Sequence, residues 1–265
     1  MSEKLQEQWD AGDLYEGYVG RWSRIVASEF LAWLSVSEGK TWADVGCGTG
    51  GLVERILIGY APRAVIGIDR SQGFLSVARR KIPDPRVRFQ LSDAVALPLE
   101  ADSCDVTVSG LTLNFVPDHK SMVREMMRAT KPGGKVAAYV WDHAGGMEMI
   151  GYFWDAAIAV TPGDARLDEG KRFPLCQPEP LRSLFQDLGL TAVSVRPIKI
   201  PTVFQDFADY WTPFLGKQGP APTYLASVDA ETRERIRQLL QARLVPQPDG
   251  SIALTARAWA VQGVV

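Results

Sequence analysis

The sequence predicts an α/β fold built on a mainly parallel sheet, and three observations lead to this prediction. An apolar run, a glycine-rich turn, a helical pattern and a second apolar run follow one another between residues 41 and 69, which is the order of a βαβ unit. Apolar strand-like runs then alternate with helical patterns as far as residue 141. Two more strand-like segments, 191–200 and 252–261, come late in the chain. We therefore expect one sheet with helices packed on it.

The βαβ unit at 41–69 has the features of a nucleotide-binding turn. Residues 46–51 read GCGTGG, and glycines there let the backbone adopt positive φ and approach a ligand closely. Asp69 ends the second strand, where a carboxylate can accept hydrogen bonds from a ribose diol. The spacing alone leaves the nucleotide open, because it fits both G-x-G-x-x-G, as in dinucleotide-binding proteins, and G-x-G-x-G.

Asp44 helps to decide between these alternatives. It lies inside the first strand, two residues before the first glycine of the turn. A carboxylate there would repel a bound pyrophosphate and attract a ligand that carries an ammonium group. The residue therefore favours a cofactor with an amino-acid moiety.

Residues 44–50 read D-V-G-C-G-T-G, and this string resembles motif I of the class I S-adenosylmethionine-dependent methyltransferases letter for letter. The resemblance implies S-adenosylmethionine as cofactor and S-adenosylhomocysteine as product. It further implies that these residues bind the cofactor: Gly46, Cys47, Gly48, Gly50, Asp69 and Arg70.

Later segments are similar to the same family, in the same order. Asp93 and Ala94 follow the third strand, where the family binds adenine through an acid and the next backbone N–H. Residues 109–118 look like the family segment S-x-x-x-L-H-F-V-P-D, which places Leu111 beside the methionine arm. Asn114 stands where histidine is frequent, so the site has one titratable group fewer.

The segment ahead of motif I is similar to one in glycine N-methyltransferase and related small-molecule enzymes. There a Tyr-x-Gly…Ser-Arg segment folds over the cofactor and its arginine pairs with the methionine carboxylate. Tyr18 and Arg24 match the tyrosine and the arginine, with a gap one residue shorter. A guanidinium suits this task because its planar fork forms two hydrogen bonds to a carboxylate.

The resemblance implies a Rossmann-like, doubly wound seven-stranded sheet, mostly parallel with an antiparallel last strand, plus helical lid insertions. We expect a single methyltransferase domain over 1–265. Within it, 1–40 would form an N-terminal helical cover, 41–141 the cofactor-binding core, and 142–265 the substrate lid segments and the last two strands.

No residue of the sequence stands out as a catalytic group. Asp142 and His143 follow the fifth strand, at the edge where open α/β sheets bind ligands, but each also fits an ordinary loop role. Tyr15 and Tyr18 could act as phenolic bases or could simply pack. An amine acceptor would need no base, whereas an oxygen or carbon acceptor usually does.

The composition limits the class of partner. The chain has 265 residues, 46% hydrophobic and 23% charged, with a net charge of −2, so no basic excess indicates a nucleic-acid substrate. Three scattered cysteines indicate a reducing compartment, and no spacing of Cys or His predicts a metal site. The start of the chain does not read as a signal peptide, and no apolar run reaches membrane-spanning length. We expect a cytoplasmic protein that acts on a small-molecule methyl acceptor, with neither nucleic acid nor membrane as partner.

Two other functions stay open on the sequence alone. The alternative glycine spacing permits a nicotinamide-dependent oxidoreductase, against which Asp44 and the acid after the third strand count. The lack of a firm catalytic residue permits a non-catalytic S-adenosylmethionine-binding protein on the same fold.

Overall fold

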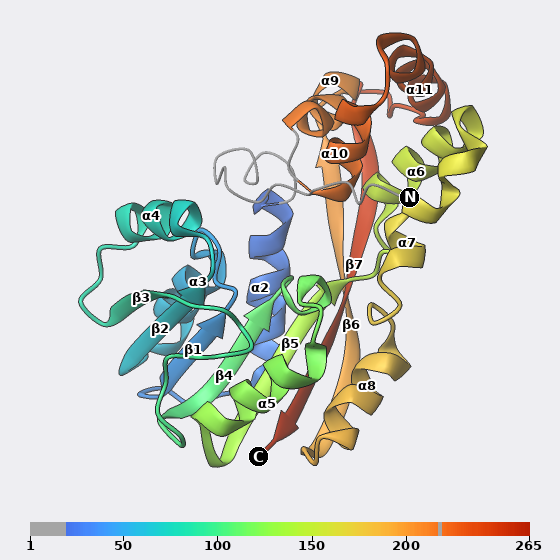
Figure 1. The fold of residues 1–265 in the computed structure, drawn as a ribbon. Helices are drawn as coiled ribbons and strands as arrows, with labels where there is room; N and C mark the ends of the chain where they lie inside the picture. Colours follow the sequence, from blue (N-terminus) through green and yellow to red (C-terminus); the bar gives the residue numbers. More distant parts are fainter. Residues whose placement is uncertain (1–19, 217–218) are drawn as a thin grey trace. The chain divides into compact units, whose positions relative to one another are not determined.

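The structure, a computed structural model, describes residues 20–216 and 219–265, which fall into two compact units (Figure 1). The first, here called the sheet unit, comprises Ser23–Val140, Leu175–Ile198 and Ala258–Val265. The second, here called the helical unit, comprises the described residues up to Trp22 together with Trp141–Pro174 and Lys199–Arg257.

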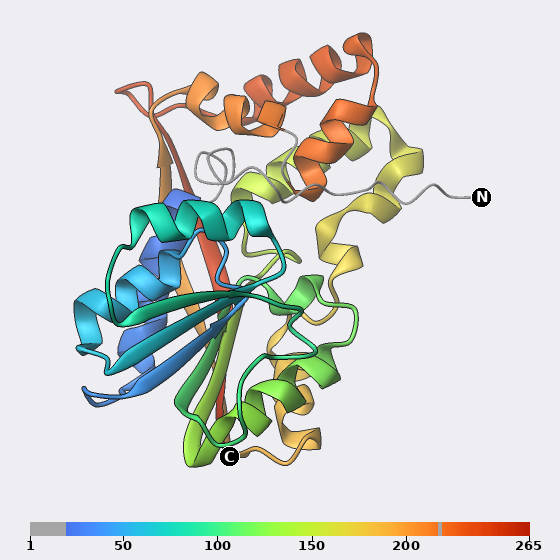
Figure 2. The same ribbon diagram turned by 60° about the vertical axis from the view of Figure 1, so that its left-hand side comes forward.

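A seven-stranded sheet with the order β3-β2-β1-β4-β5-β7-β6 is the centre of the fold. Its strands are β1 (Thr41–Val45), β2 (Ala64–Asp69), β3 (Val87–Leu91), β4 (Cys104–Gly110), β5 (Thr130–Trp141), β6 (Thr191–Phe204) and β7 (Ile252–Val264). The pairs among β1 to β5 are parallel and β7 is antiparallel, which confirms the predicted Rossmann-like sheet. In Figure 2 the strands fan out from one another, as the twist of a sheet requires.

Helices cover both faces of the sheet within the sheet unit. They are α2 (Arg21–Leu34, whose first two residues belong to the helical unit), α3 (Gly51–Tyr60), α4 (Gln72–Lys81), α5 (His119–Ala129) and α8 (Pro178–Asp187). Figure 1 shows α5 in front of the sheet and α2 behind it. The central strand β1 is apolar towards both layers, and its Trp42, Ala43 and Val45 are completely buried.

Two helices begin at side chains of types that favour the N-cap position, Ser71 and Asp118. The side chain of Ser71 accepts a hydrogen bond from the Phe74 amide at 3.2 Å at the start of α4. The side chain of Asp118 accepts one from the Ser121 amide at 2.9 Å at the start of α5. Each cap satisfies an amide that the first helical turn leaves unpaired.

The helical unit packs around its own aromatic core. Its helices are α6 (Glu148–Val160), η3 (Pro162–Leu167), α7 (Glu169–Arg172), α9 (Phe207–Trp211), η4 (Thr212–Gly216), α10 (Pro220–Ser227) and α11 (Ala230–Arg243). Phe153 and Phe214 stack with ring centroids 4.7 Å apart, and both are fully buried. Tyr224 lies edge-on to Phe153 at 6.3 Å. These aromatic side chains therefore stabilise the unit itself.

Some boundaries differ from the sequence-based expectation. The apolar pattern predicts a helix at about 203–215, whereas in the structure β6 continues to Phe204 and α9 begins at Phe207. The proline- and glycine-rich stretch before residue 223 contains the start of α10, since Pro220 occupies the first helical turn, where the missing N–H costs nothing.

Among the described helices, none combines the length and the apolar character needed to cross a membrane.

Candidate cofactor site

The glycine-rich turn between β1 and α3 is held in shape by its own backbone. The amides of Gly46 and Cys47 both donate to the Ile68 carbonyl, at 2.7 and 3.0 Å, and the Gly50 amide donates to the Cys47 carbonyl at 2.9 Å. The turn is thereby fixed against the end of β2.

Two of its glycines are required for different reasons. Gly46 has φ +76°, and a Cβ there would lie 2.3 Å from Cγ2 of Thr112. Gly48 has φ +53°, and a Cβ there would meet no atom within 4 Å. The first glycine allows close packing, and the second leaves open space over the turn.

Asp69 connects the turn to the end of β2. One of its carboxylate oxygens accepts from the Gly48 amide at 2.9 Å and the other from the Ser71 amide at 2.8 Å. Burial raises the pKa of Asp69, while these two amides and the charge of the exposed Arg70 act in the opposite direction. Each carboxylate oxygen has a further lone pair, so the group can also accept from two ribose hydroxyls.

Asp44 is a buried carboxyl group below the turn. It is 1% exposed, and neither of its oxygens has a hydrogen-bond partner among the described residues. Burial, and to a lesser extent the charge of Asp69, raises its pKa to about 8. A buried polar group without a partner is costly, and a ligand that brings a cation or hydrogen-bond donors would remove this cost.

The loop after β3 reaches Asp69 through its backbone. The amide of Ser92 donates to the Asp69 carbonyl at 3.1 Å, which places Asp93 and Ala94 directly beyond the ribose-binding candidate. Asp93 is exposed, and its side chain accepts from the Val95 amide at 3.1 Å. It therefore shapes a turn and still has lone pairs for a ligand.

The end of β4 lies against the same turn. Leu111 has φ +58° and its amide donates to the Tyr139 carbonyl at 2.8 Å. The hydroxyl of the next residue, Thr112, donates to the Gly46 carbonyl at 3.0 Å. Thr112 was not predicted from the sequence. Its contact with the turn follows from the sheet order, which places the carboxyl ends of β1 and β4 side by side.

Arg24 lies near the first turn of α3. Its Nε is 3.9 Å from Oε2 of Glu54, a residue of the helix that begins directly after the glycine turn. Tyr18 lies outside the described residues. The sheet unit thus brings together the segments that carry Arg24, the glycine turn, Asp69, Asp93 and Leu111.

Asp142 and His143 belong to the helical unit. Asp142 is 1% exposed, and its Oδ2 accepts from Nε of Arg257 at 2.6 Å, so this carboxylate is held in an ion pair. His143 is buried with its Nδ1 3.8 Å from Oε1 of Glu169. Burial, reinforced by the charge of Arg172, lowers the pKa of His143 to about 4, which makes it a weak base. The described part of the chain contains no group of three or more His, Cys, Asp or Glu side chains placed to hold a metal ion.

Comparison with known proteins identifies the family. Residues 43–138, which carry the glycine turn, Asp69, Asp93 and Leu111, match the family model described as a methyltransferase domain. This segment is a class I S-adenosylmethionine-dependent methyltransferase domain. The predicted family and cofactor are thereby confirmed.

Curated methyltransferases match about half of this chain or less. A trans-aconitate 2-methyltransferase of Variovorax paradoxus is 31% identical over 130 residues, 49% of this chain and 49% of the relative. A demethylmenaquinone methyltransferase of Halalkalibacterium halodurans is 38% identical over 107 residues, 39% of this chain and 44% of the relative. The chain spans about half the length of the curated relatives that it matches.

Solved structures share the fold of the methyltransferase domain. A methyltransferase described as putative and from an antibiotic biosynthesis pathway of Anabaena variabilis gives a TM-score of 0.62 at 19% identity, covering 91% of this chain and 97% of that one. Phosphoethanolamine N-methyltransferase 2 of Haemonchus contortus, in complex with S-adenosylhomocysteine, gives 0.59 at 18% identity, covering 96% of this chain and 56% of that one.

Proposed function

We propose that this protein transfers a methyl group from S-adenosylmethionine to a small-molecule acceptor. The observation that carries the proposal is Asp44, a fully buried carboxyl group that has no hydrogen-bond partner among the described residues and lies under an open glycine turn. The ammonium of the cofactor's methionine moiety supplies the positive charge that this group lacks. A pyrophosphate in the same place would bring no positive charge and would oppose ionisation of this carboxyl group further, which argues against a nicotinamide cofactor.

We extend the proposal to the remaining cofactor contacts, which the positions of the candidate residues support. Asp69, next to Arg70, accepts from the ribose hydroxyls, and Asp93 with the Ala94 amide binds the adenine. Leu111 lies along the methionine arm. The guanidinium of Arg24 pairs with the methionine carboxylate. The turn itself contributes the backbone of the residues Gly46, Cys47, Gly48 and Gly50.

Bound S-adenosylmethionine supplies an electrophilic methyl group on a sulfonium, and displacement at that carbon is in line. The tasks left to the chain are to orient the acceptor and to exclude water. We assign these tasks to the substrate lid segments, which are the parts of residues 142–265 that do not belong to the last two strands. Asp142 is a poor general base because it is held in an ion pair with Arg257. His143 is a poor general base because its pKa is lowered.

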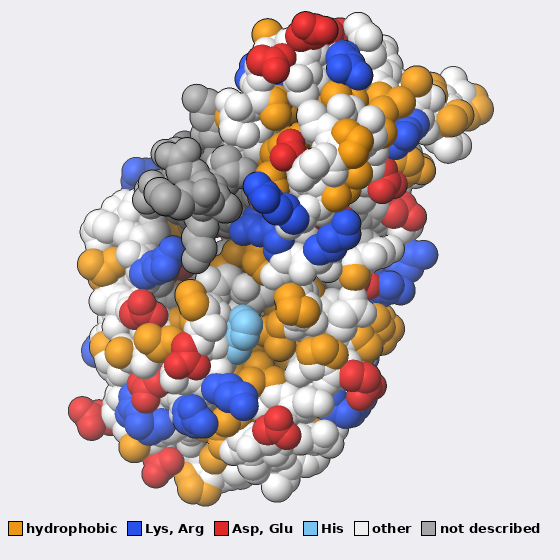
Figure 3. All heavy atoms as spheres, turned by 45° about the vertical axis from the view of Figure 1, so that its right-hand side comes forward, with side chains coloured by type: hydrophobic (Ala, Val, Ile, Leu, Met, Phe, Trp, Pro, Cys, Tyr) orange, Lys and Arg blue, Asp and Glu red, His pale blue; other side chains and the backbone are white. Residues whose placement is uncertain are grey.

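The acceptor class that fits best is a small organic acid or a quinol-like metabolite. The named relatives act on trans-aconitate and demethylmenaquinone. In Figure 3, basic and acidic side chains are interspersed over the face drawn, which gives no continuous basic surface there for a nucleic acid. The three cysteines are free and buried, which agrees with a cytoplasmic location.

The proposal is tested by a thermal-shift titration with S-adenosylmethionine, S-adenosylhomocysteine and NAD(H) in parallel. A ligand that binds only the folded chain raises its melting temperature with occupancy. We expect a shift with both adenosyl ligands and none with NAD(H), whereas a shift with NAD(H) alone would overturn the proposal. A following screen with labelled S-adenosylmethionine against organic acids and quinols distinguishes an enzyme from a protein that only binds the cofactor.

A further inference from the structure

The loop between β3 and β4, residues 92–103, has little side-chain packing of its own. Every residue of this loop is described, and none of them lies in a helix or strand. Leu97 is its one buried side chain, at 6% exposure. A loop that buries so little gains its order from hydrogen bonds, because backbone entropy opposes a fixed conformation.

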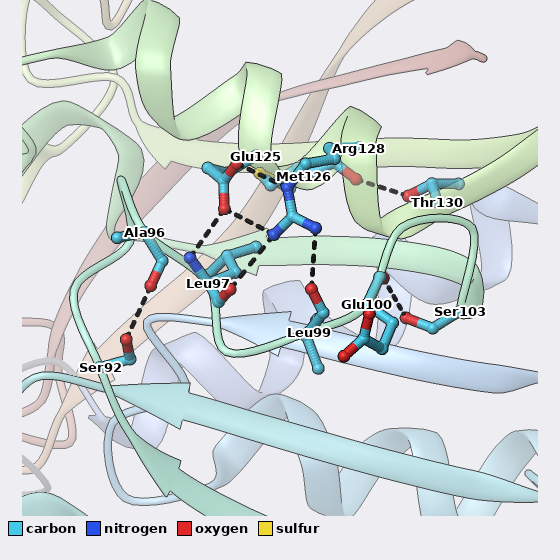
Figure 4. Close-up of polar contacts among 10 residues, drawn as sticks. All are labelled: Ser92, Ala96, Leu97, Leu99, Glu100, Ser103, Glu125, Met126, Arg128 and Thr130. Carbon is cyan, nitrogen blue, oxygen red and sulfur yellow. Dashed lines mark hydrogen bonds and ion pairs between the residues drawn. The ribbon is translucent and has the colours of Figure 1, made fainter.

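Two residues of α5, Glu125 and Arg128, supply such hydrogen bonds (Figure 4). The guanidinium of Arg128 donates to the Leu99 carbonyl through Nη1 at 2.8 Å and to the Leu97 carbonyl through Nη2 at 3.2 Å. The carboxylate of Glu125 accepts from the Leu97 amide through Oε2 at 2.8 Å. Both polar groups of the Leu97 backbone are thereby held by α5.

Glu125 and Arg128 also fix each other. Arg128 donates through Nε to Oε1 at 2.7 Å and through Nη2 to Oε2 at 2.8 Å, a bidentate pair one helical turn apart. The hydrogen bond from Arg128 holds the pKa of Glu125 below its usual range. The planar fork of arginine is needed, because one side chain must satisfy a carboxylate and two carbonyls at once.

Hydrogen bonds continue from this pair to the cofactor candidates. The hydroxyl of Ser92 donates to the Ala96 carbonyl at 2.7 Å, and the Ala96 amide donates to the Asp93 carbonyl at 3.1 Å. The Ser92 amide in turn donates to the Asp69 carbonyl at 3.1 Å. Ser92, before Asp93, is thus hydrogen-bonded to β2. Ala96, after Asp93, is the chain neighbour of Leu97, whose backbone is hydrogen-bonded to α5.

We infer that Glu125 and Arg128 are positioning residues that hold the loop 92–97 in the conformation in which Asp93 and Ala94 bind the adenine of the cofactor. They touch neither cofactor nor acceptor and act through the backbone of Leu97 and Leu99. The inference rests on the proposed function, since it assumes that the loop binds S-adenosylmethionine.

The chain offers a matched control for the pair. Glu234 and Arg237 on α11 form the same bidentate pair, with Nε to Oε2 at 2.8 Å and Nη2 to Oε1 at 2.8 Å. Their further side-chain hydrogen bonds go to Gln238 and Gln241 of their own helix. Arg237→Met therefore removes an equivalent ion pair without releasing a loop.

The experiment is a double-mutant cycle on S-adenosylhomocysteine binding, measured by calorimetry with wild type, Arg128→Met, Asp93→Ala and the double variant. We expect Kd to rise about tenfold in each single variant and only about tenfold in the double variant, because both changes remove the same contact. Glu125→Gln should give a smaller rise in Kd, since its amide oxygen can still accept from the Leu97 amide. This variant replaces Arg128→Met in the experiment if Arg128→Met does not fold. Arg237→Met should leave Kd unchanged.

Amide exchange gives an independent readout of the loop. In Arg128→Met the amides of Val95 and Leu97 should exchange faster than in wild type, and added S-adenosylhomocysteine should protect them less. A double variant about a hundredfold weaker than wild type, or an unchanged Kd in both Arg128→Met and Glu125→Gln, would overturn the inference. Wild-type protein that does not bind S-adenosylhomocysteine would instead overturn the proposed function, and the placement of adenine with it.

Discussion

Replacing Asp44 by asparagine should stabilise the protein without ligand and at the same time weaken cofactor binding. In the folded chain the pKa of Asp44 is about 8, against 3.8 for an ordinary aspartate. Between these two pH values the folded state binds a proton that the unfolded state has released. The stability that depends on this group is therefore complete below about pH 4 and is lost as the pH rises towards 8.

The size of the effect follows from the shift. Since one pKa unit corresponds to about 1.4 kcal/mol and pH 7 lies about three units above 3.8, ionisable Asp44 costs the wild type about 4 kcal/mol at pH 7. Asparagine has nearly the same shape and does not ionise. The variant should exceed the wild type in free energy of unfolding by up to this amount at pH 7, and by much less at pH 4.

Urea unfolding of both proteins between pH 4 and pH 8 measures this difference, since titrations elsewhere in the chain cancel in the comparison. Calorimetry with S-adenosylmethionine completes the test by measuring the protons released on binding. The ammonium of the cofactor should drive proton release from Asp44 in the wild type and not in the variant. The variant should bind about tenfold or more weakly, having lost a charged partner. Unfolding curves whose difference does not change with pH would refute a raised pKa, and equal affinities would remove the ammonium from this place.

Three further substitutions test other parts of the site. Asp69→Ala should weaken S-adenosylmethionine binding by about 1–3 kcal/mol, because ribose hydroxyls lose their acceptor; unchanged calorimetry would place the ribose elsewhere. Arg24→Ala should raise Kd about tenfold through the lost carboxylate pairing, and an unaltered Kd would exclude Arg24 from the site. In urea unfolding, Gly46→Ala should destabilise the fold by about 1–3 kcal/mol more than Gly39→Ala. Both glycines have φ near +75°, but only a Cβ at position 46 meets Thr112, at 2.3 Å. Equal losses of stability would show that the contact with Thr112 is unimportant.

Local patterns predicted the nucleotide-binding half of the fold well. The apolar runs of β1 and β2, the glycine turn and the cap Ser71 all act between neighbours in sequence, so the chain itself displays them. The sequence KPGG at residues 131–134 predicts a turn, but the structure of this segment is less simple. The structure includes it in β5, where Gly133 has φ +77° and the pairing with β4 shifts register. A bulge accommodates proline and glycine inside a strand, and sequence patterns do not distinguish it from a turn.

Contacts between distant segments could not be predicted. Arg257 pairs with Asp142 across 115 residues of sequence, and no spacing rule connects the two. Thr112 occupies a variable position of its motif, yet it hydrogen-bonds the Gly46 carbonyl. The position of Asp44 in its strand suggested an ammonium partner, but only the structure shows that its oxygens have no partner among the described residues.

The thiol of Cys47 gives the glycine turn a chemical reporter. It is 6% exposed, and burial, with the charges of Asp44 and Asp69, raises its pKa well above the usual value. Alkylating reagents attack thiolates, so they modify this side chain only when the turn opens. Cys104, fully buried in β4, reports the opening of the neighbouring strand in the same reaction. The ratio of the two labelling rates thus measures how often the turn opens independently of the sheet, and a bound ligand should slow the labelling of Cys47 selectively.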